Sequence, residues 1–294
     1  DDRATARHRV FAEEKFAATD AEASRGNNGE YPALETTTDE RQDDVPTDED
    51  LEQCLDALLK SKAAGVDGTP VELYQELPTC RQHLFNLVRR IWVAECTPEE
   101  MVRGVLIPIF KKKGGANDMK KYRMICLLNH SFKLLSAYLL RRTTVEVEAS
   151  LPDEQAGFRK DRGTRDNILL LARIIDNTLA RGEEGVAVFL DYEAAFDSVS
   201  HLFLDEALGA AGASDKIRSI FRAIYSKANA VVRVQKADGS HTLSRSFDVR
   251  RGVLQGDIFS PLCFIVALSR IMEVHDATGG GLTLGHDGQT EGQY

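Results

Sequence analysis

An apolar run that ends at an aspartate is the feature that most restricts what this chain can fold into. Residues 186–190 read Val-Ala-Val-Phe-Leu, and Asp191 follows directly, before a polar turn that carries Phe196 and Asp197. Such a run is typical of a buried strand. A carboxylate at a strand end can bind Mg²⁺, which prefers a few carboxylate oxygens, waters and substrate phosphates. The pattern also fits a strand followed by a loop whose aspartates only cap the next helix.

Five further blocks lie upstream and downstream of this segment. They read Ala-Gly-Val-Asp-Gly at 64–68, Ile-Pro-Ile-Phe-Lys-Lys-Lys at 107–113, Tyr-Arg-Met-Ile-Cys-Leu-Leu at 122–128, Gln-Ala-Gly-Phe-Arg-Lys at 155–160 and Arg-Gly-Val-Leu-Gln-Gly-Asp at 251–257. Together with Phe-Leu-Asp-Tyr-Glu-Ala-Ala-Phe-Asp at 189–197, they follow the order of the reverse transcriptase domain of non-long-terminal-repeat retrotransposons. The chain resembles that family over roughly residues 51–273. No single block is decisive, but six in order are highly specific.

The charges are separated along the chain, and their distribution matters more than the net charge of −9. From residue 36 to residue 56 there are nine acidic residues and one basic residue, whereas from 101 to 142 there are ten basic residues and one acidic residue. This asymmetry is expected when the acidic part of a chain is exposed to water and the basic part binds a polyanion. The basic stretch is therefore a candidate for contacts with phosphates.

Composition indicates a globular intracellular protein. With 294 residues, 43% of them hydrophobic, the chain can bury a substantial core. Five widely spaced cysteines without a Cys-x-x-Cys pair indicate a reduced protein of the cytoplasm or nucleus that is not secreted. The apolar run near 262–268 is far shorter than the roughly 20 residues of a membrane-spanning helix, so we expect no membrane partner.

Local patterns predict a mixture of helices and short strands. Residues 1–48 lack sustained apolar periodicity, so we expect a disordered or weakly helical acidic lead-in, with order beginning at a helix cap on Thr47. Two strands joined by a lysine-rich connection predict a basic hairpin, and Asp-Gly at 238–239 predicts a second one. The strands are expected at 105–110, 122–128, 186–190, 231–234 and 243–249, and further helices at 83–94, 132–148, 167–179, 201–211, 215–227 and 259–274.

The resemblance implies an α+β right-hand polymerase fold. Residues 49–185 would form the fingers and the first elements of the palm, and residues 186–294 the rest of the palm. The family's hairpin bearing Ala-Asp-Asp is absent from the sequence, so we expect a truncated palm, no thumb and no polymerase activity from this chain alone.

The resemblance also implies the chemistry of the site. Two metal ions carry phosphoryl transfer in polymerases, and the complete parent enzyme would use two Mg²⁺ ions. Asp191 would be the catalytic metal ligand, joined by the backbone carbonyl of Tyr192. Phe196 would lie beneath the sugar of the nucleotide and exclude a ribose hydroxyl. Gln255 and Gly256 would line the nucleotide pocket, where glycine lets the backbone approach a ligand.

Basic residues of the blocks would meet the phosphates. Arg123 matches the family position that contacts the triphosphate, although Met124 stands where the family usually has proline, and Lys111 is a second contact whose register the three consecutive lysines leave open. The resemblance places Arg159, Lys160 and Arg162 toward the template, with a solvated loop as the alternative. Asp197 either supports the site or caps the following helix, and we expect the cap.

The function implied for the parent protein is RNA-templated DNA synthesis. Its partners would be an RNA template, a DNA primer and deoxynucleoside triphosphates, and the sequence does not indicate an oligomeric state. The alternative is a non-catalytic RNA-binding relic of a retroelement. The basic hairpin and the missing carboxylates favour this alternative.

Overall fold

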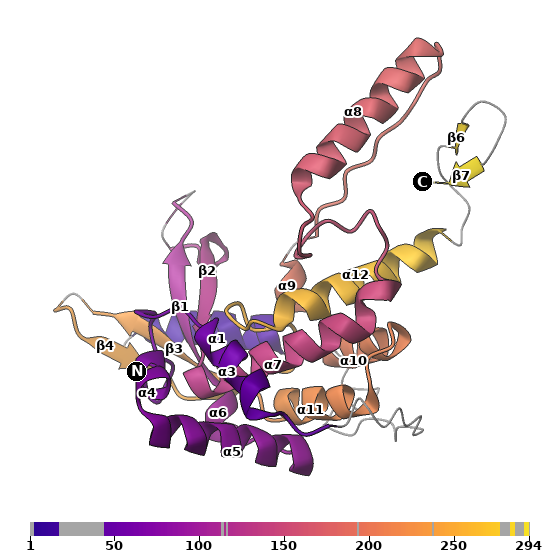
Figure 1. Ribbon diagram of the computed structural model, residues 1–294. Coiled ribbons are helices and arrows are strands. Elements are labelled where there is room, and N and C mark those ends of the chain that lie inside the picture. The colour runs from indigo at the N-terminus through magenta and orange to yellow at the C-terminus, as the bar shows by residue number, and fades with distance from the viewer. Residues whose placement is uncertain are drawn as a thin grey trace.

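The computed structural model describes residues 3–17, 44–112, 115, 117–192, 194–236, 238–276, 283–285 and 291–293. Helices surround one mixed sheet, which gives the α+β class expected from the sequence (Figure 1). The helices are α1 (Arg3–Phe16), α3 (Asp48–Asp56), α4 (Val71–Glu76), α5 (Pro78–Ala94), α6 (Glu99–Val102), η1 (Met119–Lys121), α7 (His130–Val147), η2 (Glu148–Ser150), α8 (Thr164–Ala180), α9 (Ala195–Ser198), α10 (His201–Ala210), α11 (Asp215–Tyr225) and α12 (Ser260–Asp276). The strands are β1 (Arg103–Phe110), β2 (Tyr122–Leu127), β3 (Asn229–Gln235), β4 (His241–Leu243), β5 (Phe247–Asp248), β6 (Thr283–Gly285) and β7 (Glu291–Gln293).

The main sheet has the order β2-β1-β3-β4, and β5 also pairs with β3. Strands β1 and β2 form the predicted basic hairpin, antiparallel from Val105↔Leu127 to Phe110↔Tyr122. Strand β3 runs parallel to β1 over Arg103–Leu106 and turns back into β4 at the predicted Asp-Gly. Pro108 lies beyond the part of β1 that pairs with β3, where the strand has a free side that does not need an N–H donor.

Apolar faces of the helices form the core against this sheet. Trp92 of α5 is fully buried and meets Tyr138 of α7 edge to face, with ring centroids 5.2 Å apart. The apolar stripe of α11 is buried and includes Ile217, Ile220 and Phe221. The predicted cap is present at α3, where the Thr47 hydroxyl accepts from the Asp50 N–H and the Asp50 carboxylate accepts from the Thr47 N–H.

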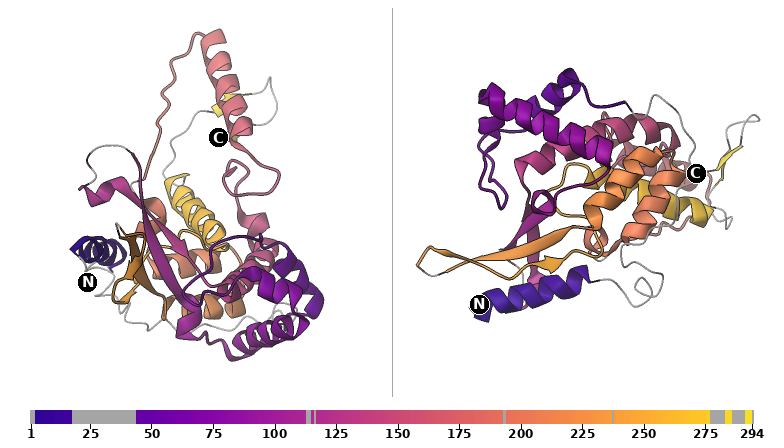
Figure 2. Two further views of the ribbon diagram at one scale, coloured as in Figure 1. Left: turned by 90° about the vertical axis from the view of Figure 1, so that its left-hand side faces the viewer. Right: turned by 90° about the horizontal axis from the view of Figure 1, so that it is seen from below.

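The acidic lead-in contains an ordered helix. Residues 3–16 form α1, which lies along β3 and buries Ala12 and Phe16 (Figure 2, right). The expectation of a disordered or weakly helical lead-in is therefore wrong for this stretch, and residues 1–2 and 18–43 lie outside the described residues. Short apolar stripes such as this one gain their stability from tertiary packing, which composition does not reveal.

The strand predicted at 186–190 does not form. This stretch is extended but unpaired, and its apolar side chains face solvent, with Val186 93% and Phe189 82% exposed. It runs beside α8, and both stand away from the rest of the molecule in Figures 1 and 2. A strand needs a neighbour to satisfy its backbone groups, and no other strand of the described residues lies beside this one. Among the described helices, none is long and apolar enough to cross a membrane.

Candidate nucleotide and template site

Two blocks that are far apart in the sequence are joined by backbone hydrogen bonds. The N–H of Gly252 donates to the carbonyl of Val199 at 2.7 Å, and the N–H of Val253 donates to the carbonyl of Phe196 at 2.7 Å. An isolated antiparallel bridge links Ser200 and Arg251 beside them. The Phe-Asp pair at 196–197 therefore lies against the loop that carries the Gln-Gly pair at 255–256.

The free edge of β2 brings in a third block. The N–H of Cys126 donates to the carbonyl of Gln255 at 2.8 Å. Gly256 has φ +131°, and a Cβ there would lie 2.3 Å from the Cys126 carbonyl oxygen. Only glycine permits this close approach of two backbones. The sheet, the Phe196–Asp197 end of the 189–197 block and the 251–257 loop therefore meet at one place.

Asp257 fixes the other end of this loop to the core. Its buried carboxylate accepts hydrogen bonds from the hydroxyl groups of Ser136 on α7 and Ser260 on α12. Burial raises the pKa of Asp257, and the hydroxyl donors oppose that rise. The loop is thus held at both ends, with Gln255 and Gly256 between the two anchors.

Phe196 is the middle of three aromatic rings. It stacks on Phe264 of α12, with centroids 4.3 Å apart and an interplanar angle of 23°. On another side it meets Phe158 edge to face, with centroids 5.8 Å apart at 85°. Aromatic pairs favour both arrangements, so the position of the Phe196 ring is set from two directions.

Asp197 is buried and does not cap the following helix. The cap of α10 is Ser200, whose hydroxyl accepts from the Phe203 N–H at 3.0 Å. The Asp197 carboxylate instead lies 2.5 Å from the Lys15 ammonium of α1 and accepts from the Gln255 side-chain amide at 3.4 Å. The expected cap role is therefore wrong. Asp197 connects the N-terminal helix to the Gln-Gly loop.

Two more contacts fasten α1 to this loop. The N–H of Arg250 donates to the carbonyl of Phe16 at 2.9 Å, and the Arg251 guanidinium donates to the carbonyl of Lys15 at 2.9 Å. These donors satisfy carbonyl groups that the last turn of a helix leaves without partners. Nothing in the sequence pairs Lys15 with Asp197, since the contact arises only when the chain has folded.

Replacing Lys15 with methionine should lower the free energy of unfolding by about 1–3 kcal/mol, because the Asp197 charge would remain buried without its partner. Arg7→Met on the same helix is the control, since Arg7 is exposed and a surface change is worth about 0.5 kcal/mol or less. Urea denaturation of the two variants measures the difference. Equal effects would mean that the ion pair does not hold α1 in place.

Asp191 and Tyr192 lie at the end of the extended segment, and both side chains are exposed. Among the described residues, no group of three or more His, Cys, Asp or Glu side chains is arranged to hold a metal ion. Asp197 is already paired with Lys15. One exposed carboxylate does not make a two-metal centre, so the described residues do not by themselves fit the pair of ions that the resemblance implied.

Lys111 and Arg123 lie on the basic hairpin, and both are exposed. The N–H of Lys111 donates to the carbonyl of Lys121 at 2.8 Å, which closes the hairpin beyond the strand ends. Because side chains alternate along a strand, Arg123 lies on the face of β2 opposite to the buried Met124 and Cys126. Both cations are thus presented to solvent, as a phosphate contact requires.

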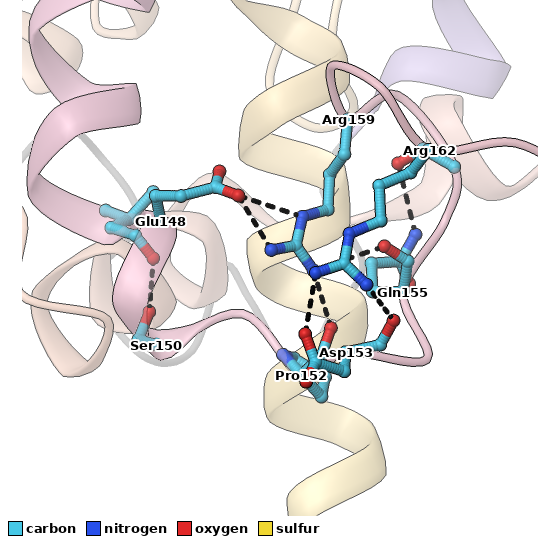
Figure 3. A network of polar contacts seen from close by, with 9 residues as sticks. Glu148, Ser150, Pro152, Asp153, Gln155, Arg159 and Arg162 are labelled. Atoms are coloured by element: carbon cyan, nitrogen blue, oxygen red, sulfur yellow. Dashed lines mark hydrogen bonds and ion pairs between the residues drawn. The ribbon is translucent and has the colours of Figure 1, made fainter.

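Two of the three expected template residues form hydrogen bonds and ion pairs with other residues of the chain. The Arg159 guanidinium donates to the Glu148 carboxylate at 2.7 Å and to the Pro152 carbonyl at 2.6 Å, and its side chain is 5% exposed. Arg162 donates to the carbonyl and carboxylate of Asp153 at 2.8 and 2.6 Å (Figure 3). These contacts of Arg159 and Arg162 hold the loop 151–163 in shape. Lys160 is exposed.

Comparison with known proteins identifies the class. Residues 110–279, more than half of the chain, match the family described as reverse transcriptase (RNA-dependent DNA polymerase). The chain therefore belongs to the reverse transcriptase family.

The relatives narrow this to the non-long-terminal-repeat retrotransposon type, as the six blocks indicated. The chain is 30% identical over 236 residues to the Retrovirus-related Pol polyprotein from type-1 retrotransposable element R2 of Popillia japonica, covering 80% of the chain and 32% of that protein. It is 26% identical over 239 residues to the Transposon TX1 uncharacterized 149 kDa protein of Xenopus laevis, covering 81% and 18%. It is 24% identical over 242 residues to the RNA-directed DNA polymerase from mobile element jockey of Drosophila funebris, covering 80% and 25%. The chain thus spans a third or less of the length of these relatives.

Proposed function

We propose that this chain carries the nucleotide-binding and template-binding part of a retrotransposon polymerase whose complete protein performs RNA-templated DNA synthesis. The observation that carries the proposal is the meeting of three blocks through the Gly252, Val253 and Cys126 N–H groups. Backbone hydrogen bonds of this kind pre-organise a site, which is most of what a protein contributes to phosphoryl transfer.

The residues of this site have distinct roles in the proposal. Phe196, held between two other rings, forms the floor beneath the sugar and selects deoxynucleotides. Gln255 and Gly256 form the adjacent wall. The exposed Arg123 and Lys111 of the hairpin neutralise the triphosphate. In this arrangement residues 49–185 correspond to fingers and early palm, and residues 186–294 belong to the palm.

Asp191 is the proposed catalytic carboxylate, with the Tyr192 carbonyl beside it. Members of the family generally use divalent metal ions, and Mg²⁺ suits a site of carboxylates, water and phosphates. The unpaired, apolar stretch before Asp191 supports the proposal that further strands pair with it in the complete protein and supply the other carboxylates. Without them we expect no primer extension from this chain.

The test is primer extension on an RNA template with the natural downstream sequence attached. Asp191→Asn should reduce extension by at least about a hundredfold, the usual cost of removing one electrostatic group from a transition state. Asp176→Asn, an exposed aspartate on α8, is the matched control and should extend like the unmodified protein. Unchanged extension by Asp191→Asn would remove Asp191 from the mechanism.

A non-catalytic RNA-binding relic remains the second candidate. Among the described residues no three possible metal ligands lie together, and Asp197 is paired with Lys15, which favours this candidate. The same experiment separates the two functions, because a relic would bind RNA without extending a primer.

A further inference from the structure

Phe158 adopts a backbone conformation that phenylalanine rarely takes. Its φ is +57°, in the left-handed region, and its side chain is nevertheless 64% exposed. A bulky side chain in this region is strained and persists only where the surrounding structure imposes it. Burial does little to compensate for the strain, since most of the surface of this residue remains in contact with water.

The neighbouring contacts impose this conformation. Arg159 follows directly, and its buried guanidinium ties the loop to Glu148 and to the Pro152 carbonyl (Figure 3). Arg162, farther along the same side of the loop, donates to Asp153. Both arginines follow Phe158 and both bind residues that precede it, so the two contacts close the loop across Phe158 and restrain its backbone.

The ring of Phe158 points to the candidate site. It meets Phe196 edge to face at 5.8 Å, and Phe196 stacks on Phe264 at 4.3 Å. Phe158 is therefore the exposed end of a row of three rings, while Phe264 at the other end belongs to α12. Lys160, two residues on in the same loop, is also exposed and carries a positive charge.

We propose that Phe158 is a stacking platform for a base of single-stranded RNA beside the nucleotide pocket. Exposed aromatic rings and cations in one loop are the groups that bind single-stranded nucleic acid without reading its sequence, because every base has a flat apolar face and every nucleotide a phosphate. The strained backbone conformation of Phe158 then keeps the ring out of the core, where a base can stack on it. This inference rests on the proposed function for the identity of the nucleic acid.

The first test is binding of a fluorescein-labelled oligouridine by fluorescence anisotropy, with the chain as it stands. Phe158→Leu should weaken binding about 5- to 150-fold, the loss expected for one stacked base, whereas Phe158→Tyr should restore it. Phe189→Leu is the matched control, because Phe189 is also exposed but lies in the unpaired segment away from the three rings, and it should bind like the unmodified chain. Thermal melts establish that the variants fold.

A spectroscopic test locates the base. Phe158→Trp places an exposed indole in the loop, against a native Trp92 that is fully buried and gives a constant background. Oligouridine should quench the emission of Phe158→Trp saturably and leave that of Phe189→Trp unchanged. Equal quenching of the two, unchanged affinity in Phe158→Leu, or no binding of oligouridine by the unmodified chain would overturn the inference.

These results are separate from the proposed polymerase activity. Stacking on Phe158 is measured without a primer or a nucleotide, so a protein that stacks RNA but never extends a primer would support this inference and contradict the proposed synthesis. A protein that extends primers while Phe158→Leu binds RNA normally would do the reverse.

Discussion

Gly252→Ala should lower the free energy of unfolding by about 3 kcal/mol, through two causes that act at the same residue. Gly252 has φ +74°, a conformation that alanine adopts only with strain. A Cβ there would also lie 2.6 Å from the backbone C, Cα and O atoms of Asp197, so one of the two segments must move. That movement would weaken the hydrogen bonds from the Gly252 N–H to Val199 and from the His201 ring to the Gly252 carbonyl.

A second glycine separates the two causes. Gly239 has φ +83° in the turn between β3 and β4, but a Cβ there would meet no atom within 4 Å. Gly239→Ala should therefore cost only the backbone strain, about 1–2 kcal/mol. Urea denaturation of both variants gives the contribution of the close approach as the difference. Equal losses would mean that the 196–200 and 251–253 segments separate easily, which would weaken the proposed pre-organised site.

Asp205→Asn should destabilise the protein by about 3–5 kcal/mol, because it leaves two arginines without their shared counter-charge. The Asp205 side chain on α10 is 1% exposed and accepts from Arg218 on α11 at 3.2 and 3.0 Å, one bond to each oxygen. Arg222 donates to the same carboxylate at 2.6 Å. Asparagine keeps the shape but removes the charge, and its amide turns a donor toward a guanidinium.

An exposed ion pair in the same protein is the control. Asp248 and Arg250 lie 3.1 Å apart with side chains 67% and 59% exposed. Water screens this pair, so Asp248→Asn should change stability by about 1 kcal/mol or less. Thermal and urea melts measure both variants. A small effect of Asp205→Asn would show that α10 and α11 are held by their apolar contacts alone.

Local signals predicted most of the elements around the site. The lysine-rich connection between two β-rich runs became the β1–β2 hairpin, and Asp-Gly at 238–239 became the β3–β4 turn. Thr47 and Asp50 formed their cap. These features depend on residues close together in the chain, so periodicity and turn chemistry are sufficient to find them.

Features that depend on a distant partner were missed or misjudged. The apolar run at 186–190 has the composition of a strand, but among the described residues it has no neighbour and stays exposed. Arg159 looked like a template contact from its block, yet Glu148 and Pro152 occupy its donors. The pairing of Lys15 with Asp197 could not be predicted from the sequence, because the two side chains come together only when the intervening chain has folded.

The sequence by itself determined the family, the α+β class and the local hairpins and caps, because each of these depends on residues that are close together in the chain. The tertiary structure alone decided the geometry: which N–H groups join the Phe-Asp pair to the Gln-Gly loop, which helix neutralises Asp197, and which aromatic ring is left facing solvent beside Phe196. The physical reason is that close approach, burial and charge pairing are properties of pairs of segments, and a one-dimensional pattern does not contain the distance between them.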